Sequence, residues 1–174
     1  MSSNSFRMLS LAFFAISFSI LAYFLFRAFI GLDDFFPVGE NMVVIEFPPP
    51  PFPLYAKPIT YFAFFFALGW MFGLEAIKDV VKEWPKNLIT LIFILTGFFA
   101  YFMGYEILFN FMLWSTLISI SSNNGKLEVN PDLLANSFPN PSMTWNLVFA
   151  TKIFTVLFFV SIYTMYFLVS LKGK

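Results

Sequence analysis

Apolar and polar positions alternate along this chain in long blocks. Four apolar blocks are each long enough to cross a bilayer, which takes about 20 helical residues, and polar segments separate them. The sequence therefore predicts an all-α integral membrane protein, a single membrane domain of residues 1–174 folded as a four-transmembrane-helix bundle. The predicted spans are residues 8–30, 58–76, 88–112 with an extension to 120, and 144–171.

The third block is the longest. Residues 88–120 contain no proline, no basic residue and one carboxylate, Glu106. A helix of this length exceeds what the hydrocarbon core requires. We therefore expect it to tilt, to bend near Gly97 or Gly104, or to project beyond the lipid.

The connections differ in character. Residues 31–57 and 121–143 are expected to form two ordered extracytoplasmic loops. The first contains a possible short strand at 42–47 and a proline run at 48–53 that favours stiff polyproline II. Residues 77–87 form the predicted cytoplasmic loop. The helix before it continues into charged residues whose i,i+3 spacing predicts two ion pairs, Glu75 with Lys78 and Asp79 with Lys82.

Small residues at four-residue spacing mark possible helix contacts, because they let backbones approach closely. In the first span Ala15 and Ser19 form such a pair. The second span contains two pairs and the third span two glycines, and these are the predicted helix-packing residues: Ala63, Ala67, Gly69, Gly73, Gly97 and Gly104.

Basic residues predict the orientation. Arg7 and the lysines of loop 77–87 and of the chain end would share one side, so the positive-inside rule places both termini in the cytoplasm of a multi-pass plasma-membrane protein. Aromatic side chains near the ends of spans are expected to act as interface anchors. These are Trp84, Trp114 and Trp145.

Composition supports a membrane protein and narrows the chemistry. The chain is 59% hydrophobic and 11% charged, against about 25% charged residues in soluble domains. It has no cysteine and no histidine, which removes thiolate chemistry, the usual haem ligand and the commonest metal ligand. We expect no cofactor, no metal site and no catalytic residue. No basic patch indicates nucleic acid.

Three ionisable groups fall within the predicted spans away from their cytoplasmic edge. Glu106 and Lys152 would reach similar depths on antiparallel helices, and Arg27 belongs to the same layer. Ionisable groups at membrane depth are costly when unpaired. We expect Glu106 to form an intramembrane ion pair with Lys152 or Arg27. Its alternative role is a proton or cation waypoint.

Scarce polar groups, stiff loops and small-residue helix faces favour a non-catalytic accessory subunit of a larger membrane complex. Its partners would be other membrane subunits and lipids. By analogy, an energy-transducing or oxidoreductase complex is expected, such as a respiratory oxidase or a membrane copper or ammonia monooxygenase. The alternative is a small transporter or quinone-binding protein that uses Glu106 and the aromatic second span. A third hypothesis is a membrane anchor whose outer loops bind a partner.

Overall fold

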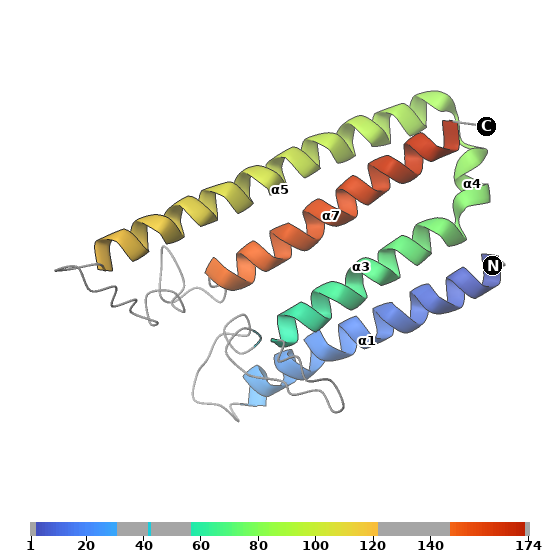
Figure 1. Cartoon of the computed structure of the whole chain (residues 1–174). Helices are drawn as coiled ribbons and strands as arrows, with labels where there is room; N and C mark the ends of the chain where they lie inside the picture. Colours follow the sequence, from blue (N-terminus) through green and yellow to red (C-terminus); the bar gives the residue numbers. More distant parts are fainter. Residues whose placement is uncertain (1–2, 31–41, 43–56, 122–146, 173–174) are drawn as a thin grey trace.

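The structure is a computed structural model that describes residues 3–30, 42, 57–121 and 147–172. Within these ranges the backbone is almost entirely helical and contains no strand. The helices are α1 (Ser3–Ile30), α3 (Pro58–Ala76), α4 (Lys78–Lys82), α5 (Lys86–Ser121) and α7 (Leu147–Lys172) (Figure 1). Four of them are long and apolar enough to cross a membrane, namely all except α4. The protein is therefore all-helical, with four candidate membrane spans.

Prolines mark two of the helix starts. Pro58 occupies the first turn of α3, where its missing N–H has no helical partner to lose. After α3, Ile77 interrupts the helix and α4 forms a short turn. The carbonyl of Pro85 then accepts hydrogen bonds from the first turn of α5. These features place the reversal between α3 and α5 at residues 77–85.

Helix α5 is a single helix of 36 residues, about 54 Å at 1.5 Å per residue. It is continuous through Gly97 and Gly104 and extends past the level at which α7 begins (Figure 1). The hydrocarbon core is only about 30 Å thick. Helix α5 is therefore longer than the hydrocarbon core is thick.

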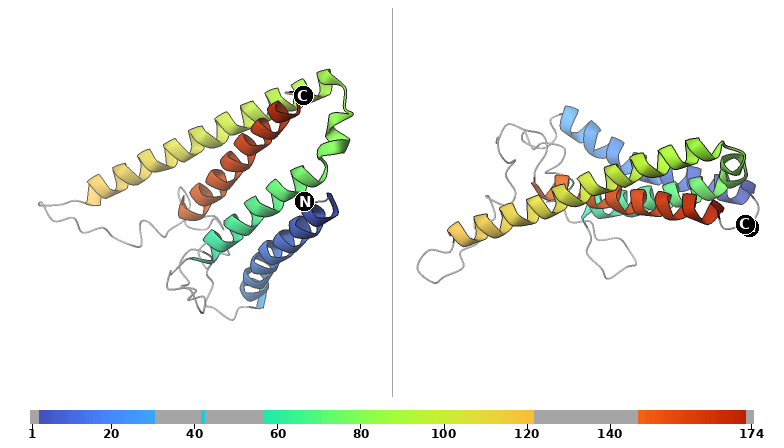
Figure 2. Two further views of the ribbon diagram at one scale, coloured as in Figure 1. Left: turned by 45° about the vertical axis from the view of Figure 1, so that its right-hand side comes forward. Right: turned by 90° about the horizontal axis from the view of Figure 1, so that it is seen from above.

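The four long helices form an open row. Helix α1 packs against α3, α3 against α7, and α7 against α5 (Figures 1 and 2). Each outer pair is an antiparallel hairpin, and the second helices of the two hairpins, α3 and α7, run parallel in the middle. The start of α1, the end of α7 and α4 lie at the same end of the molecule (Figure 1). Helices α1 and α5 are consequently the two edges of the row.

A repeat of seven residues joins α1 to α3. Three serines of α1 are spaced seven residues apart, and the Oγ of each donates a hydrogen bond to a carbonyl oxygen of α3. The bonds are Ser3 to Ala76 at 2.9 Å, Ser10 to Gly69 at 2.8 Å and Ser17 to Phe62 at 3.0 Å. The next position of the repeat is Phe24, which is buried. This is the register of an antiparallel coiled-coil seam, and we call it the serine seam.

The serine seam corrects one prediction. Ala15 and Ser19 were expected to form the small face of the first span, but both are exposed, whereas Ser10 and Ser17 are buried. The reason is the period. Packing against α3 follows the seven-residue repeat, and Ala15 and Ser19 lie off that stripe.

Between α1 and α3 the structure describes two residues, Met42 and Lys57. Met42 is the informative one. It has helical backbone rather than the predicted strand, and it is fully buried. It packs in a cluster with Phe24, Ile59 and Phe149, from α1, α3 and α7. The cluster therefore ties both hairpins together at the end opposite α4. The other predicted loop features, including the proline run, lie outside the described residues.

Candidate functional site

An open groove runs along one face of the row, with α7 as its floor and α3 and α5 as its walls. Its volume is about 400 Å³. Aromatic and aliphatic side chains make up most of the lining, and three hydroxyl-bearing residues interrupt it. The lining residues are Phe66, Trp70, Leu95, Thr96, Phe99, Leu157, Val160, Ser161 and Thr164.

The hydroxyls on the floor of this groove already donate their hydrogens. Thr164 Oγ1 accepts a hydrogen bond from Trp70 Nε1 at 2.9 Å and donates to the Val160 carbonyl at 2.7 Å. Ser161 Oγ donates to the Leu157 carbonyl at 2.7 Å. A hydroxyl oxygen keeps two lone pairs after donating its proton. Ser161 therefore offers an acceptor to any group that enters the groove.

Glu106 lies on the groove side of α5. It follows Phe99 by seven residues, which is two helical turns, so both side chains share one face of the helix. Its depth is fixed by neighbours on α5. Asn110 bonds Thr151 of α7, and Gly104 packs beside Phe158. Glu106 is therefore level with the interior of the α7 span, and its side chain is partly buried.

The structure places Lys152 within about one helical turn of the level of Glu106, but on another face of α7. Lys152 Nζ donates a hydrogen bond to Thr60 Oγ1 of α3 at 3.1 Å. Lys152 and the groove residue Ser161 are nine residues apart, or two and a half turns, so they lie on opposite faces of α7. Among the residues that the structure describes, no ion pair joins Glu106 to Lys152.

Arg27 is farther away. It is on α1, at the other edge of the row from α5 (Figure 1). Its Nη1 donates to Tyr23 OH at 3.4 Å, and its guanidinium lies 5.8 Å from the centre of that ring. The structure thus does not bring the three predicted ionisable groups together.

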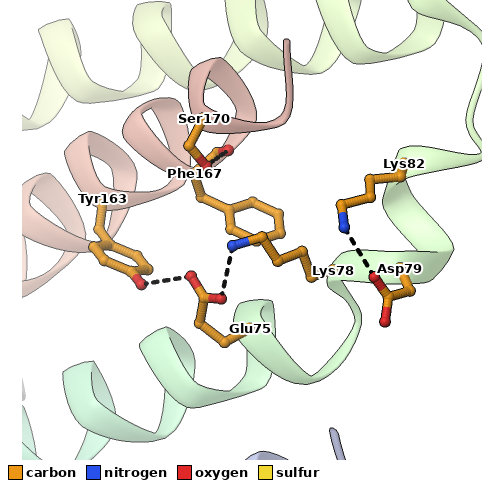
Figure 3. Close-up of polar contacts among 7 residues, drawn as sticks. All are labelled: Glu75, Lys78, Asp79, Lys82, Tyr163, Phe167 and Ser170. Carbon is orange, nitrogen blue, oxygen red and sulfur yellow. Dashed lines mark hydrogen bonds and ion pairs between the residues drawn. The ribbon is translucent and has the colours of Figure 1, made fainter. Parts of the chain in front are cut away.

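A second polar cluster lies at the α4 end of the row (Figure 3). Glu75 accepts a hydrogen bond from Lys78 Nζ at 3.1 Å and another from Tyr163 OH at 3.3 Å. Lys82 pairs with Asp79 at 3.0 Å. Both i,i+3 ion pairs predicted from the sequence are present. The contact from Tyr163 adds a link between α3 and α7 that the spacing could not reveal.

The glycines predicted to pack helices lie at the two hairpin seams. A Cβ added to Gly69 would be 2.9 Å from the Phe14 ring, and one on Gly73 would be 3.1 Å from Ser10 Oγ. Gly97 and Gly104 face α7 with more room, 3.5 Å and 3.4 Å from the nearest side-chain atoms. The alanines of the second span, Ala63 and Ala67, are partly buried.

The predicted tryptophan anchors have different surroundings. Trp84 packs against the apolar cluster of Val81, Phe167 and Leu168 near α4. Trp114 packs edge-on to Phe111, and its buried Nε1 has no hydrogen-bond partner among the described residues. Trp145 lies outside the described residues.

Two further interhelical bonds were also not anticipated from the sequence. Asn110 Nδ2 donates to Thr151 Oγ1 at 2.9 Å in a buried contact between α5 and α7, and Trp70 Nε1 donates to Thr164. Asn110 carried a usable signal, because it is an amide in an apolar run and must find a partner in lipid. Trp70 carried none, since many aromatic residues surround it in the sequence.

These contacts describe an apolar groove that offers hydrogen-bond acceptors along its floor. Glu106 lies two turns beyond the lining residue Phe99, on the same side of α5. The groove can hold an elongated apolar occupant that donates hydrogen bonds. In comparisons with known proteins, no family model, no curated protein and no solved structure matches this chain.

Proposed function

We propose that this protein is a non-catalytic subunit of a larger membrane complex, of the energy-transducing or oxidoreductase kind. The respiratory oxidases and the membrane copper or ammonia monooxygenases are the classes we favour. It would span the plasma membrane four times with both termini in the cytoplasm. Its partners would be other membrane subunits and lipids.

One observation carries this proposal. Tyr101 and Tyr105 are 69% and 55% exposed on α5, at an edge of the row. Gly104 lies between them along the chain and packs beside Phe158, so both tyrosines are far from the ends of α7. Neither hydroxyl has an acceptor among the described residues. Hydrocarbon offers a hydroxyl no hydrogen bond, whereas a neighbouring subunit can supply one.

The surroundings of these tyrosines fit a contact surface. Large apolar side chains on the same helix are exposed, among them Ile94, Phe98, Phe102, Leu108 and Met112. Lipid alone could cover apolar side chains. Two hydroxyls among them favour a protein partner, because buried tyrosines at interfaces pair their O–H groups.

The test is the size and composition of the particle that carries the chain. A tagged chain is extracted from its native membranes in mild detergent, separated by native electrophoresis and identified by mass spectrometry. We expect migration with larger subunits and loss of that particle in the double variant Tyr101→Phe, Tyr105→Phe. Tyr166→Phe is the matched control, since Tyr166 is equally exposed but lies on α7 and nearer to the end of its helix. A stable, active monomer would refute the proposal.

The groove favours a second candidate, a small transporter or quinone-binding protein that uses Glu106. Phe66, Trp70 and Phe99 supply aromatic walls of the kind that hold planar ligands. Purified protein in liposomes tests this function. Glu106→Gln should abolish transport or quinone turnover while leaving the folded fraction unchanged. If any activity instead scales with the folded fraction, the role of Glu106 is structural.

A further inference from the structure

We propose that the groove between α3 and α5 is the docking surface for one transmembrane helix of a partner subunit, and that this helix carries a Lys or Arg at the depth of Glu106. The inference rests on the proposed function and deepens it, because it names the surface and the chemistry of the partner.

The row creates room for such a helix. Helices α3 and α5 pack on opposite sides of α7, and packed helix axes are about 8–10 Å apart. The axes of the two wall helices are therefore at most about 16–20 Å apart, which is the spacing that lets one helix lie between them above α7. A helix laid over α7 would contact both walls and begin a second layer. Ser161 and Thr164 on the floor are small enough for a close approach.

The charge of Glu106 indicates which kind of residue the partner helix carries. Glu106 lies inside the membrane span and faces the groove side of α5. In the part of the chain that the structure describes, no cation pairs with it. Lys152 lies within about one helical turn of this level, but it bonds Thr60 on the opposite face of α7. A carboxylate at this depth is stabilised by a cation brought by another chain.

The possible occupants of the groove differ in whether they can donate hydrogen bonds. The free lone pairs of Ser161 and the carboxylate of Glu106 are all acceptors, so the occupant must donate. A lipid acyl chain has no donor, and an oxidised quinone presents only carbonyl oxygens. An ammonium or guanidinium group on a helix donates several hydrogen bonds. The groove therefore fits a basic residue on an apolar helix better than a lipid or a quinone.

Site-specific photo-crosslinking in native membranes tests the surface. A benzoylphenylalanine is placed at Phe99, inside the groove, or at Phe159, which is 63% exposed and lies seven residues from Lys152, on the same face of α7. Both positions are phenylalanines in the full-length chain, so Phe159 is a matched control. We expect Phe99 alone to capture an apolar segment of another protein, with a Lys or Arg within about two turns of the crosslink.

Other products would overturn the inference. These are an adduct at Phe99 with lipid, with quinone, with a second copy of this chain or with a helix that has no basic residue, and also no adduct at all. Native electrophoresis of the same samples distinguishes failure of the docking surface from failure of the proposed subunit role. If the chain migrates in a larger particle but Phe99 gives no such adduct, the docking surface is wrong and the subunit role stands. If the chain migrates alone, both are wrong.

A charge reversal tests the pairing itself. Glu106→Gln should lower the Phe99 adduct at least fivefold, and Glu106→Asp should retain most of it. Thermal unfolding of each purified variant shows whether the chain still folds. Glu106→Lys should lose the adduct and regain it when the captured Lys or Arg of the partner is changed to Glu. If the partner variant does not restore the adduct of Glu106→Lys, and both proteins are folded, the proposed ion pair is wrong.

Discussion

Ser10 Oγ lies 2.8 Å from the carbonyl oxygen of Gly69 and is the middle bond of the serine seam between α1 and α3. A Cβ on Gly73, one turn along α3, would be 3.1 Å from the same hydroxyl oxygen. Glycine on α3 and a short serine on α1 are therefore both needed for this close approach. They let a hydroxyl reach a backbone carbonyl that already belongs to a helix.

The serine seam should be measurable by substitution. Ser10→Ala and Ser17→Ala each remove one buried interhelical bond, and such bonds in membrane proteins are worth about 0.6 kcal/mol on average. We expect each variant to lower the free energy of unfolding in mixed micelles by about that amount. Ser19→Ala, an exposed serine on the same helix, should change it little. Equal effects at Ser10 and Ser19 would contradict the seam.

The two hairpins should respond differently to added methyl groups. Alanine is favoured over glycine in a helix by about 0.5–1 kcal/mol. At Gly97 the new Cβ meets Met165 at an ordinary 3.5 Å, so Gly97→Ala should be neutral or stabilising. At Gly69 it meets the Phe14 ring at 2.9 Å, so Gly69→Ala should be destabilising. Thermal unfolding in one detergent compares them, and the reverse order would show that the α1–α3 seam is looser than described.

Asn110 and Thr151 should be energetically coupled. Their hydrogen bond is buried between α5 and α7 at 2.9 Å. A double-mutant cycle with Asn110→Ala and Thr151→Val should give a coupling of about 0.6 kcal/mol, with about 1.7 as the upper end for such bonds. The exposed Asn87 supplies the control, because Asn87→Ala combined with Thr151→Val should be additive. Additivity at Asn110 as well would mean that the bond contributes no stability.

Glu106 and Lys152 should be independent in the isolated chain. They lie on different faces of the row, about one helical turn apart in depth, so Glu106→Gln and Lys152→Met are expected to change the free energy of unfolding additively, to within about 0.5 kcal/mol. The ion pair expected from the sequence makes the opposite prediction. A coupling well above that limit in the purified protein would show that Glu106 and Lys152 do pair.

The proposed orientation can be tested with single cysteines, because the chain has none of its own. Glu83→Cys lies just after α4, on the side that the basic residues assign to the cytoplasm. Lys126 falls between α5 and α7 in the sequence, within the predicted extracytoplasmic loop 121–143. An impermeant maleimide should label Lys126→Cys in intact cells and Glu83→Cys only after permeabilisation. The reverse pattern would invert the topology.

The long helices could be predicted from the sequence because their signal is local. The second predicted span, 58–76, coincides with α3, since Pro58 marks its start and polar residues follow its end. The third is almost the whole of α5. The first helix begins earlier than predicted, at Ser3, because serine and asparagine there continue the helical backbone ahead of the apolar run.

Lateral order could not be predicted, because these helices are apolar on nearly every side. In a soluble helix the polar face identifies the side that points to water, whereas lipid removes that distinction. The sequence alone therefore does not distinguish Ala15 and Ser19 from Ser10 and Ser17 as packing positions. The predicted depths of Glu106 and Lys152 agree with the structure only to within about one helical turn. Which face each occupies depends on α3 and α7 being neighbours, and no local pattern indicates that.

The middle of the row also sets an order for biosynthesis. Ser17 and Phe62 belong to one hairpin, so their bond can form as soon as the first two spans have left the ribosome. The bond from Trp70 to Thr164 joins residues 94 apart and must wait for the last span. Until then the flank of α3 that will receive α7 is open in the nascent chain. The nascent chain therefore carries an indole N–H on α3 without this acceptor until the last span arrives.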